Sequence, residues 1–199
     1  MQIKSKHSNK KSLFISVLGG LSYGVPVATI SGVLGEPKFE ALSQAERAFI
    51  SSSLMYGILI GTFLAFLLID YFGRRKLIIF FGLESFLFAL LLSAMDTPAS
   101  IITMRLIQGI GVGAIQTISP IYSLELASDD WKGMFVLLFQ VHITIGYIIG
   151  YTLNIIFNYV TDGWRYEFGL AGIPIFIYSV GTIFLTESDV YKKKNADNI

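Results

Sequence analysis

Six polar side chains recur at alternating steps of four and three residues along one apolar segment. They are Gln140, Thr144, Tyr147, Tyr151, Asn154 and Asn158. On a helix this spacing places all six on one face. Hydroxyl and amide groups both donate and accept hydrogen bonds, which suits a neutral polyhydroxyl ligand, whereas an anion path needs several cations. The alternative is that these groups bond only to neighbouring helices, because buried polar atoms need partners with or without a ligand.

A second segment, residues 105–125, sets Arg105, Gln108 and Gln116 beside a GxGxG run inside another apolar stretch. An ionisable residue within a membrane is unfavourable by about 3 kcal/mol and generally faces a water-filled pathway or a partner. We therefore interpret Arg105 as an intramembrane charge on a pore-lining helix, which indicates transport rather than anchoring. Glu84 on the preceding span is a candidate partner for it. His142 lies almost opposite Gln140 on its helix, so we interpret it as structural.

These polar groups lie on long apolar runs, which must form the elements that position them. Hydrophobic residues make up 53% of the chain and charged residues 15%, and the mean hydropathy is +0.64, which is unlike a soluble domain. Crossing a hydrocarbon core takes about 17 to 25 residues, and six runs qualify: 13–34, 48–69, 77–95, 99–123, 133–157 and 167–185. Backbone N–H and C=O groups cannot remain unpaired in lipid, so each run is predicted to be a helix. The expected fold is an all-α membrane protein, a six-transmembrane-helix bundle over residues 13–185.

Small residues recur at helical spacing on several of these spans. Pairs four residues apart include Gly20 and Gly24, Gly57 and Gly61, Gly109 and Gly113, and Gly146 and Gly150. Small side chains let helix backbones approach closely in lipid. The spacing therefore predicts a tightly packed bundle.

Basic residues are distributed unevenly between the two ends of the predicted spans. If the chain starts in the cytosol, 11 of the 15 basic residues fall on that side: Lys4, Lys6, Lys10, Lys11, Arg74, Arg75, Lys76, Lys132, Lys192, Lys193 and Lys194. This positive-inside bias predicts that both termini are cytosolic. Residues 1–12 are expected to form a basic cytosolic tail and residues 186–199 a second tail, with the Lys-rich ends mobile.

Several function classes have no support in the sequence. The chain has no cysteine and two histidines, and it shows no nucleophile or metal-ligand spacing. We expect neither an enzyme nor a bound metal or cofactor. Nucleic-acid binding has no support.

A charged turn follows the second span, with Asp70, Gly73, Arg74 and Arg75 in the pattern DxxGRR. Glycine permits a tight turn, and the arginines can bond to carboxylates or to helix C-termini. These charges, with others of the next loop, form either a latch between moving helices or a simple topology signal.

The motifs together make the chain resemble the N-terminal half of a sugar porter of the major facilitator superfamily. The matching motifs are DxxGRR at 70–75, RxxxGxGxG at 105–113, PxYxxE at 120–125, Lys132-Gly133, QxxxxxG at 140–146, WRxxxGxxxxP at 164–174 and Glu187-Ser188. The resemblance implies that Gln140 contacts the sugar and that Tyr23 is the aromatic residue near it. Thr144, Tyr147 and Gln116 share the expected polar faces. The resemblance also implies a cytosolic gating network of Asp70, Gly73, Arg74, Arg75, Glu125, Lys132 and Glu187.

Three departures from the family pattern bear on function. Proton-coupled members carry an aspartate on the first helix where this chain has Pro26. Coupling needs a titratable group in the path, so we expect facilitative transport. Phe66 stands where the family has a glycine before the charged turn. The exit motif reads Thr186-Glu187-Ser188-Asp189-Val190, without its proline and arginine.

Length is the remaining departure, because the resemblance implies two six-helix halves with the substrate between them. Three interpretations are open. The chain is a fragment of a full transporter, it pairs with itself or with another half, or it is a non-transporting subunit that binds a full-length relative. The expected function is transport of a hexose-like sugar, incomplete without a second half, in the plasma membrane.

Overall fold

The chain folds into helices throughout the part that its computed structural model describes, residues 2–196, with side chains described for residues 8–194. In order, the helices are α1 (Gln2–Ala28), α2 (Ile30–Val33), α3 (Pro37–Glu40), α4 (Gln44–Phe72), α5 (Arg74–Ser93), α6 (Pro98–Leu126), a 3-10 turn η1 (Asp129–Trp131), α7 (Lys132–Phe157), α8 (Gly163–Ala171), α9 (Ile173–Ile183) and α10 (Asp189–Ala196).

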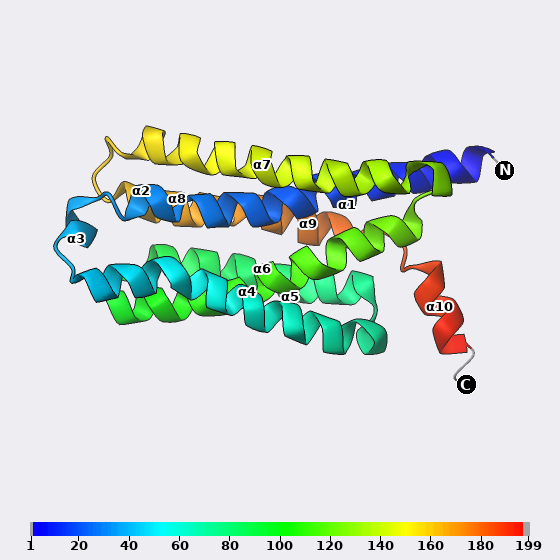
Figure 1. Cartoon of the computed structure of the whole chain (residues 1–199), viewed down its shortest axis with the longest axis horizontal. Helices are drawn as coiled ribbons and strands as arrows, with labels where there is room; N and C mark the ends of the chain where they lie inside the picture. The colour runs from blue at the N-terminus through cyan, green and yellow to red at the C-terminus, as the bar shows by residue number, and fades with distance from the viewer. Residues whose placement is uncertain (1, 197–199) are drawn as a thin grey trace.

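The long helices lie roughly parallel in two groups (Figure 1). One group contains α1, α2, α7, α8 and α9, and the other contains α4, α5 and α6. The α6 helix joins the two groups, because it packs against α4 and α5 and also against α1. Both ends of the chain lie at one end of the bundle, called here the termini end, and α3 lies at the other, called here the α3 end.

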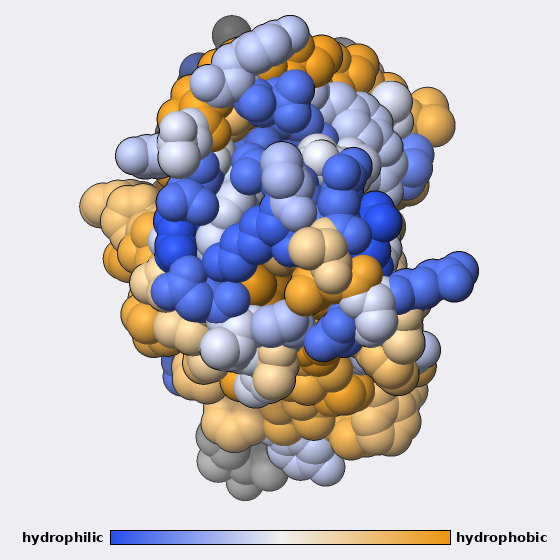
Figure 2. All heavy atoms as spheres, turned by 90° about the vertical axis from the view of Figure 1, so that its left-hand side faces the viewer, coloured by the Kyte–Doolittle hydropathy of each residue, from blue (hydrophilic) through white to orange (hydrophobic). Residues whose placement is uncertain are grey.

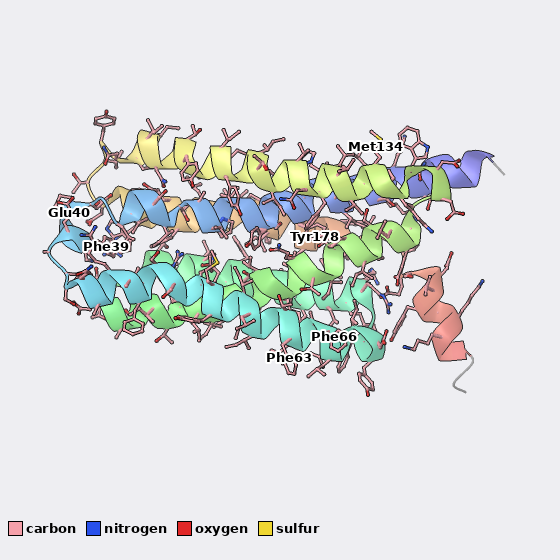
Figure 3. All side chains as sticks on the ribbon, in the orientation of Figure 1. Phe39, Glu40, Phe63, Phe66, Met134 and Tyr178 are labelled. Carbon is pink, nitrogen blue, oxygen red and sulfur yellow. The ribbon has the colours of Figure 1, made fainter. Side chains whose placement is uncertain are left out.

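Six helical spans of the described part are long and apolar enough to cross a membrane: Ser8–Val33, Gln44–Phe72, Arg74–Ser93, Pro98–Leu126, Asp129–Phe157 and Gly163–Ile183. This confirms the predicted six-helix architecture. Figure 2 shows hydrophilic residues gathered on the end face that carries α3, with hydrophobic residues around its sides. In Figure 3, Phe63 and Phe66 point outward from α4. An apolar outer belt with a polar end is the surface that a bilayer requires.

Two spans are interrupted where the sequence predicts a single helix. The first breaks at Thr29, three residues after Pro26, and the sixth breaks at Gly172, two residues before Pro174. Proline lacks the N–H that the helix ladder needs, so a nearby break has a direct cause. The first break lies near the α3 end and the second in the middle of the sixth span, and each span still counts as one crossing.

The first helix begins at Gln2, so it extends through residues predicted to form a tail. Contacts with the end of α6 explain the extension. The Ser12 hydroxyl donates to the Ser123 carbonyl at 2.9 Å, and Asn9 accepts from the Ser128 N–H at 3.1 Å. At the other end of the chain, residues 189–196 form α10. Met1 and residues 197–199 of the expected tails lie outside the described residues.

Glycines form the closest helix contacts, as their spacing predicts. A methyl group at Gly61 of α4 would lie 1.9 Å from the Ile110 carbonyl oxygen of α6, and one at Gly24 of α1 would lie 2.2 Å from the Ile143 carbonyl oxygen of α7. Only glycine fits at such a backbone-to-backbone approach. These contacts fix α4 on α6 and α1 on α7, and they thereby position the polar faces of α6 and α7.

Candidate functional site

The polar residues of α7 form an exposed stripe along most of the helix. Gln140, Thr144 and Tyr151 are exposed and Tyr147 is half-buried. The residues that pack α7 onto α1 lie on a neighbouring face and include Ile143, Gly146 and Gly150. The stripe is therefore available to a ligand or to another protein surface. We call Gln140, Thr144, Tyr147 and Tyr151 the α7 polar stripe.

Asn154 departs from the stripe although its spacing predicts membership. Its side chain is 9% exposed and points toward the break between α1 and α2. The amide is assigned with its oxygen accepting from the Ser31 hydroxyl at 3.0 Å and from the Gly32 N–H at 3.1 Å. Its nitrogen then donates to the Thr29 carbonyl at 3.1 Å and to the Glu167 carboxylate. Asn154 thus ties α7 to the break and to α8, while Asn158 is exposed.

Tyr23 of α1 lies beside the stripe. The ring centroids of Tyr23 and Tyr147 are 6.5 Å apart, with the rings tilted by 56°, which is within the range of aromatic pairs. Both side chains are half-buried. The fold therefore brings the expected aromatic residue of the first span next to the middle of the α7 polar stripe.

Gln116 occupies a different helix, α6, and has a different environment. It is half-buried, and its Oε1 atom is shielded from solvent without a hydrogen-bond partner in the described part of the chain. The hydroxyl of its neighbour Thr117 donates to the Gly113 carbonyl at 2.9 Å and lies 3.3 Å from the Thr62 hydroxyl of α4. The Gln116 amide oxygen is therefore an acceptor inside the bundle, unpaired among the described residues, rather than part of an exposed surface.

Arg105 is buried at 1% exposure in α6. Its guanidinium carbon lies 5.2 Å from the Phe168 ring centroid of α8, a cation–π contact. Its Nε and Nη2 atoms have no hydrogen-bond partner among the described residues, and neither do the two carboxylate oxygens of Glu84. The candidate pair between Arg105 and Glu84 is therefore not formed here. Glu84 instead lies over Gly111, where a methyl group would come within 2.2 Å of its Oε2.

One ring nitrogen of His142, Nδ1, has a hydrogen-bond partner within its own helix. Its Nδ1 lies 2.7 Å from the Leu138 carbonyl oxygen, and the side chain is half-buried. This local partner accounts for the residue without a ligand.

The charged turn between α4 and α5 builds a cluster at the termini end. The Arg74 guanidinium bonds to the Glu125 carboxylate of α6 at 2.8 Å and lies 3.5 Å from the Asp70 carboxylate. It also donates to the Ile69 carbonyl at 3.3 Å, which accepts the Gly73 N–H as well at the end of α4. Arg74 is 7% exposed. A low-exposure ion pair of this kind couples the turn to α6.

Glu187 joins the same cluster from the segment before α10. Its carboxylate accepts from the Arg75 N–H at 3.1 Å, and the Arg75 guanidinium donates to the Thr182 carbonyl at 3.3 Å. Gly73 has φ of +85°, and a methyl group there would lie 2.7 Å from Glu187 Oε2. Glycine is required here for both reasons. Lys132 does not join the cluster, because it pairs with Asp129 at 2.7 Å on the surface.

A second charged cluster, at the α3 end, was not identified from the sequence. The Lys38 ammonium and the Arg165 guanidinium lie 4.6 Å and 4.5 Å from the Trp164 ring centroid, and both cations pair with Asp96. The Lys38 hydrogen bond, followed by the one from Arg165, lowers the pKa of the Asp96 carboxyl below its usual value of 3.8. Glu36 accepts from the Trp164 N–H at 3.1 Å. This cluster joins α3 and α8 to the connection between α5 and α6.

The chain is similar to known proteins in both sequence and fold. Residues 8–198 match the family described as sugar (and other) transporter. The chain is 35% identical over 190 residues to a glucose transporter of Staphylococcus epidermidis, covering 94% of this chain and 42% of that protein. It is 32% identical over 183 residues to a D-xylose transporter of Levilactobacillus brevis, covering 92% and 40%.

The fold matches a solved structure over the same extent. A crystal structure of a D-xylose–proton symporter superposes with a TM-score of 0.82 at 24% identity, covering 94% of this chain and 50% of that one. The chain thus spans about half the length of this structure and about two fifths of the curated relatives' length.

Proposed function

Because the chain belongs to the sugar (and other) transporter family and is a multi-pass membrane protein, we propose that it moves a neutral hexose-like sugar across the membrane. The observation that carries this proposal is the α7 polar stripe with Tyr23 beside it. Exposed amide and hydroxyl groups on a membrane span suit hydrogen bonding to sugar hydroxyls, and a tyrosine ring suits packing against the sugar's C–H face. In this proposal Gln140, Thr144, Tyr147, Tyr23 and Gln116 contact the substrate.

We further propose that transport is facilitative. The first span carries Pro26 and has no carboxylate between residues 8 and 33, so it offers no proton-binding group in the position beside the substrate. Arg105 is packed against Phe168 and lacks an acidic partner among the described residues. The α7 polar stripe and Tyr23 contain no carboxylate and no histidine, and a carrier without such a group beside its substrate moves the substrate down its gradient.

A complete pathway needs a second six-helix half in this proposal. The stripe is polar and exposed on one bundle, and lipid would leave its hydrogen-bonding groups unpaired. The second half is supplied by a longer form of the same polypeptide, by a second copy, or by a full-length relative. In this proposal the protein lies in the plasma membrane with both termini in the cytosol, and the Arg74 and Glu187 contacts form the gate on the cytosolic side.

The alternative function is a non-transporting membrane subunit or fragment that associates with a full-length transporter. In this alternative the exposed α7 polar stripe bonds to a transmembrane surface of that transporter rather than to a sugar, which also satisfies its hydrogen-bonding groups.

Uptake into liposomes tests the proposal directly. The full chain is reconstituted alone and together with a full-length relative, and saturable hexose exchange is measured. Gln140→Ala is expected to reduce uptake about tenfold, the loss typical of one or two hydrogen bonds to a substrate. Thr152→Ala is the matched control, since Thr152 is an exposed polar residue of α7 that lies outside the α7 polar stripe. Absent exchange with co-purification of the relative supports the subunit, and unchanged uptake in Gln140→Ala removes that residue from the site.

A further inference from the structure

The turn that joins α4 and α5 lies at the termini end of the bundle (Figure 1). An apolar groove beside it is lined by residues of both helices. Of these, Leu77 and Phe81 are each 5% exposed and Leu68 is half-buried. Phe72 and Phe80, which are 52% and 65% exposed, also line it. Its volume is about 310 Å³. Apart from one lysine the lining is apolar, which suits a segment of hydrocarbon chain rather than a polar solute.

One cation, Lys76, lines this groove together with the five apolar residues. The turn contributes three consecutive basic residues, and two of them are engaged by the protein. Arg74 pairs with Glu125 at 2.8 Å, and the Arg75 guanidinium donates to the Thr182 carbonyl. Lys76 is exposed, and it belongs to none of the ion pairs among residues 8–194. Its ammonium is therefore available to an external anion.

The acids around the turn are engaged by groups other than Lys76. Asp70 is paired with Lys194 at 2.8 Å and with Arg74. The Glu187 carboxylate accepts from the Arg75 N–H at 3.1 Å and so occupies the positive end of α5. The charge that an anion meets at the groove is therefore that of the Lys76 ammonium.

We propose that this groove binds an acyl chain of an anionic glycerophospholipid, with the lipid phosphate paired to Lys76. The α5 span begins at Arg74, so Lys76 lies within the first helical turn of the span, where headgroups meet the hydrocarbon. Lysine places its alkyl stem along apolar surface and its ammonium in the headgroup layer. A net negative headgroup is selected because the groove presents a cation without a compensating acid. A zwitterionic headgroup brings its own ammonium to the same positive field.

Native mass spectrometry of the purified full chain tests this assignment. Wild-type protein is equilibrated with equal amounts of phosphatidylglycerol and phosphatidylcholine of identical acyl chains, and the retained lipids are counted. We expect phosphatidylglycerol to be preferred, and Lys76→Gln to reduce that preference about fivefold. Lys193→Gln, the same charge change at an exposed position of α10, is expected to leave it unchanged. Equal losses in the two variants would show general charge attraction and would overturn the site.

A groove variant separates the acyl chain from the headgroup. Phe80→Ser is expected to lower retention of both lipids without altering their ratio, because it removes apolar surface but no charge. Glycerol phosphate, which has the headgroup charge without acyl chains, is expected not to displace the bound lipid. Full displacement by glycerol phosphate would identify a free-phosphate site, and cross-linking from residue 80 to a second copy would identify a protein contact. Either result refutes the lipid site.

Discussion

The ion pair between Arg74 and Glu125 gives the sharpest test of the charged cluster. Its atoms are 2.8 Å apart, and the two side chains are 9% and 13% exposed. Breaking a buried pair costs about 3–5 kcal/mol. Asp70 remains 3.5 Å from the guanidinium, so part of the compensation survives. We therefore expect Glu125→Gln to lower the free energy of unfolding by about 2 kcal/mol.

The assay is unfolding in mixed detergent and denaturing micelles, followed by circular dichroism. Lys132→Gln is the matched control, because Lys132 pairs with Asp129 on the surface, where the side chains are 45% and 93% exposed. This change is expected to leave the unfolding midpoint in place. Combining Glu125→Gln with Arg74→Gln should restore part of the loss, with a coupling energy of about 1–2 kcal/mol. Equal destabilisation by Lys132→Gln, or additive losses in the double variant, would refute the described cluster.

Three further changes test the packing and the polar contacts. Gly61→Ala should lower the free energy of unfolding by about 1–3 kcal/mol in the same assay, since its methyl group meets the α6 backbone. Gly133→Ala, with open space around it, should leave it unchanged. An equal loss at position 133 would contradict the close approach of α4 to α6. Asn154→Ala should lower stability by about 1–3 kcal/mol by removing its bonds to three segments, whereas Asn158→Ala at an exposed site should be neutral; equal effects would argue against the inward amide. The lowered pKa of Asp96 means that its ionised form stabilises the fold above pH 3.8 and that this contribution is lost as pH falls through the lower folded-state pKa. The acid unfolding curve of Asp96→Asn should therefore be flatter than that of wild type at the lowest pH values, and identical curves would remove the carboxylate from the α3-end cluster.

The architecture follows from features that the sequence displays plainly. Apolar run length predicts six spans, and glycine spacing predicts the close contacts at Gly24 and Gly61, because both depend on local periodicity in lipid. The breaks at Thr29 and Gly172 differ from the uninterrupted helices expected. Their signals, Pro26 and Pro174, were present in the sequence, but proline is tolerated in many membrane helices, so its effect depends on neighbouring contacts.

The polar contacts were less predictable because neighbouring helices decide them. The five steps from Gln140 to Asn158 average 3.6 residues, which is the helical period, so the stripe keeps its direction along α7. Asn154 lies at the edge of the stripe, four residues after the buried Gly150 and therefore beside the packing face, where Thr29 and Glu167 bond to it. Lys132 pairs with Asp129 three residues earlier rather than with the charged turn. Pairing with a residue three positions away orders less of the chain than pairing with a distant residue, so its entropic cost is lower.

The cluster around Trp164 shows a different limit of sequence reasoning. Lys38 lies on α3, Asp96 between α5 and α6, and Arg165 on α8, with no periodic relation in the sequence. The Trp164-Arg165 dipeptide is part of a motif, but no spacing links it to Lys38. Only the packing of the helices brings these three segments together at the α3 end.

We infer that the α7 polar stripe lines an aqueous cleft that a second half closes. The chain has no cysteine, so single cysteines can be placed at Thr144 and, as a control outside the stripe, at Thr152, and labelled with a membrane-impermeant thiol reagent in the assembled protein. We expect labelling at position 144 that hexose slows, and little labelling at position 152. A cysteine at position 144 that is shielded from the reagent, or labelled at a rate that no sugar changes, would refute the aqueous cleft.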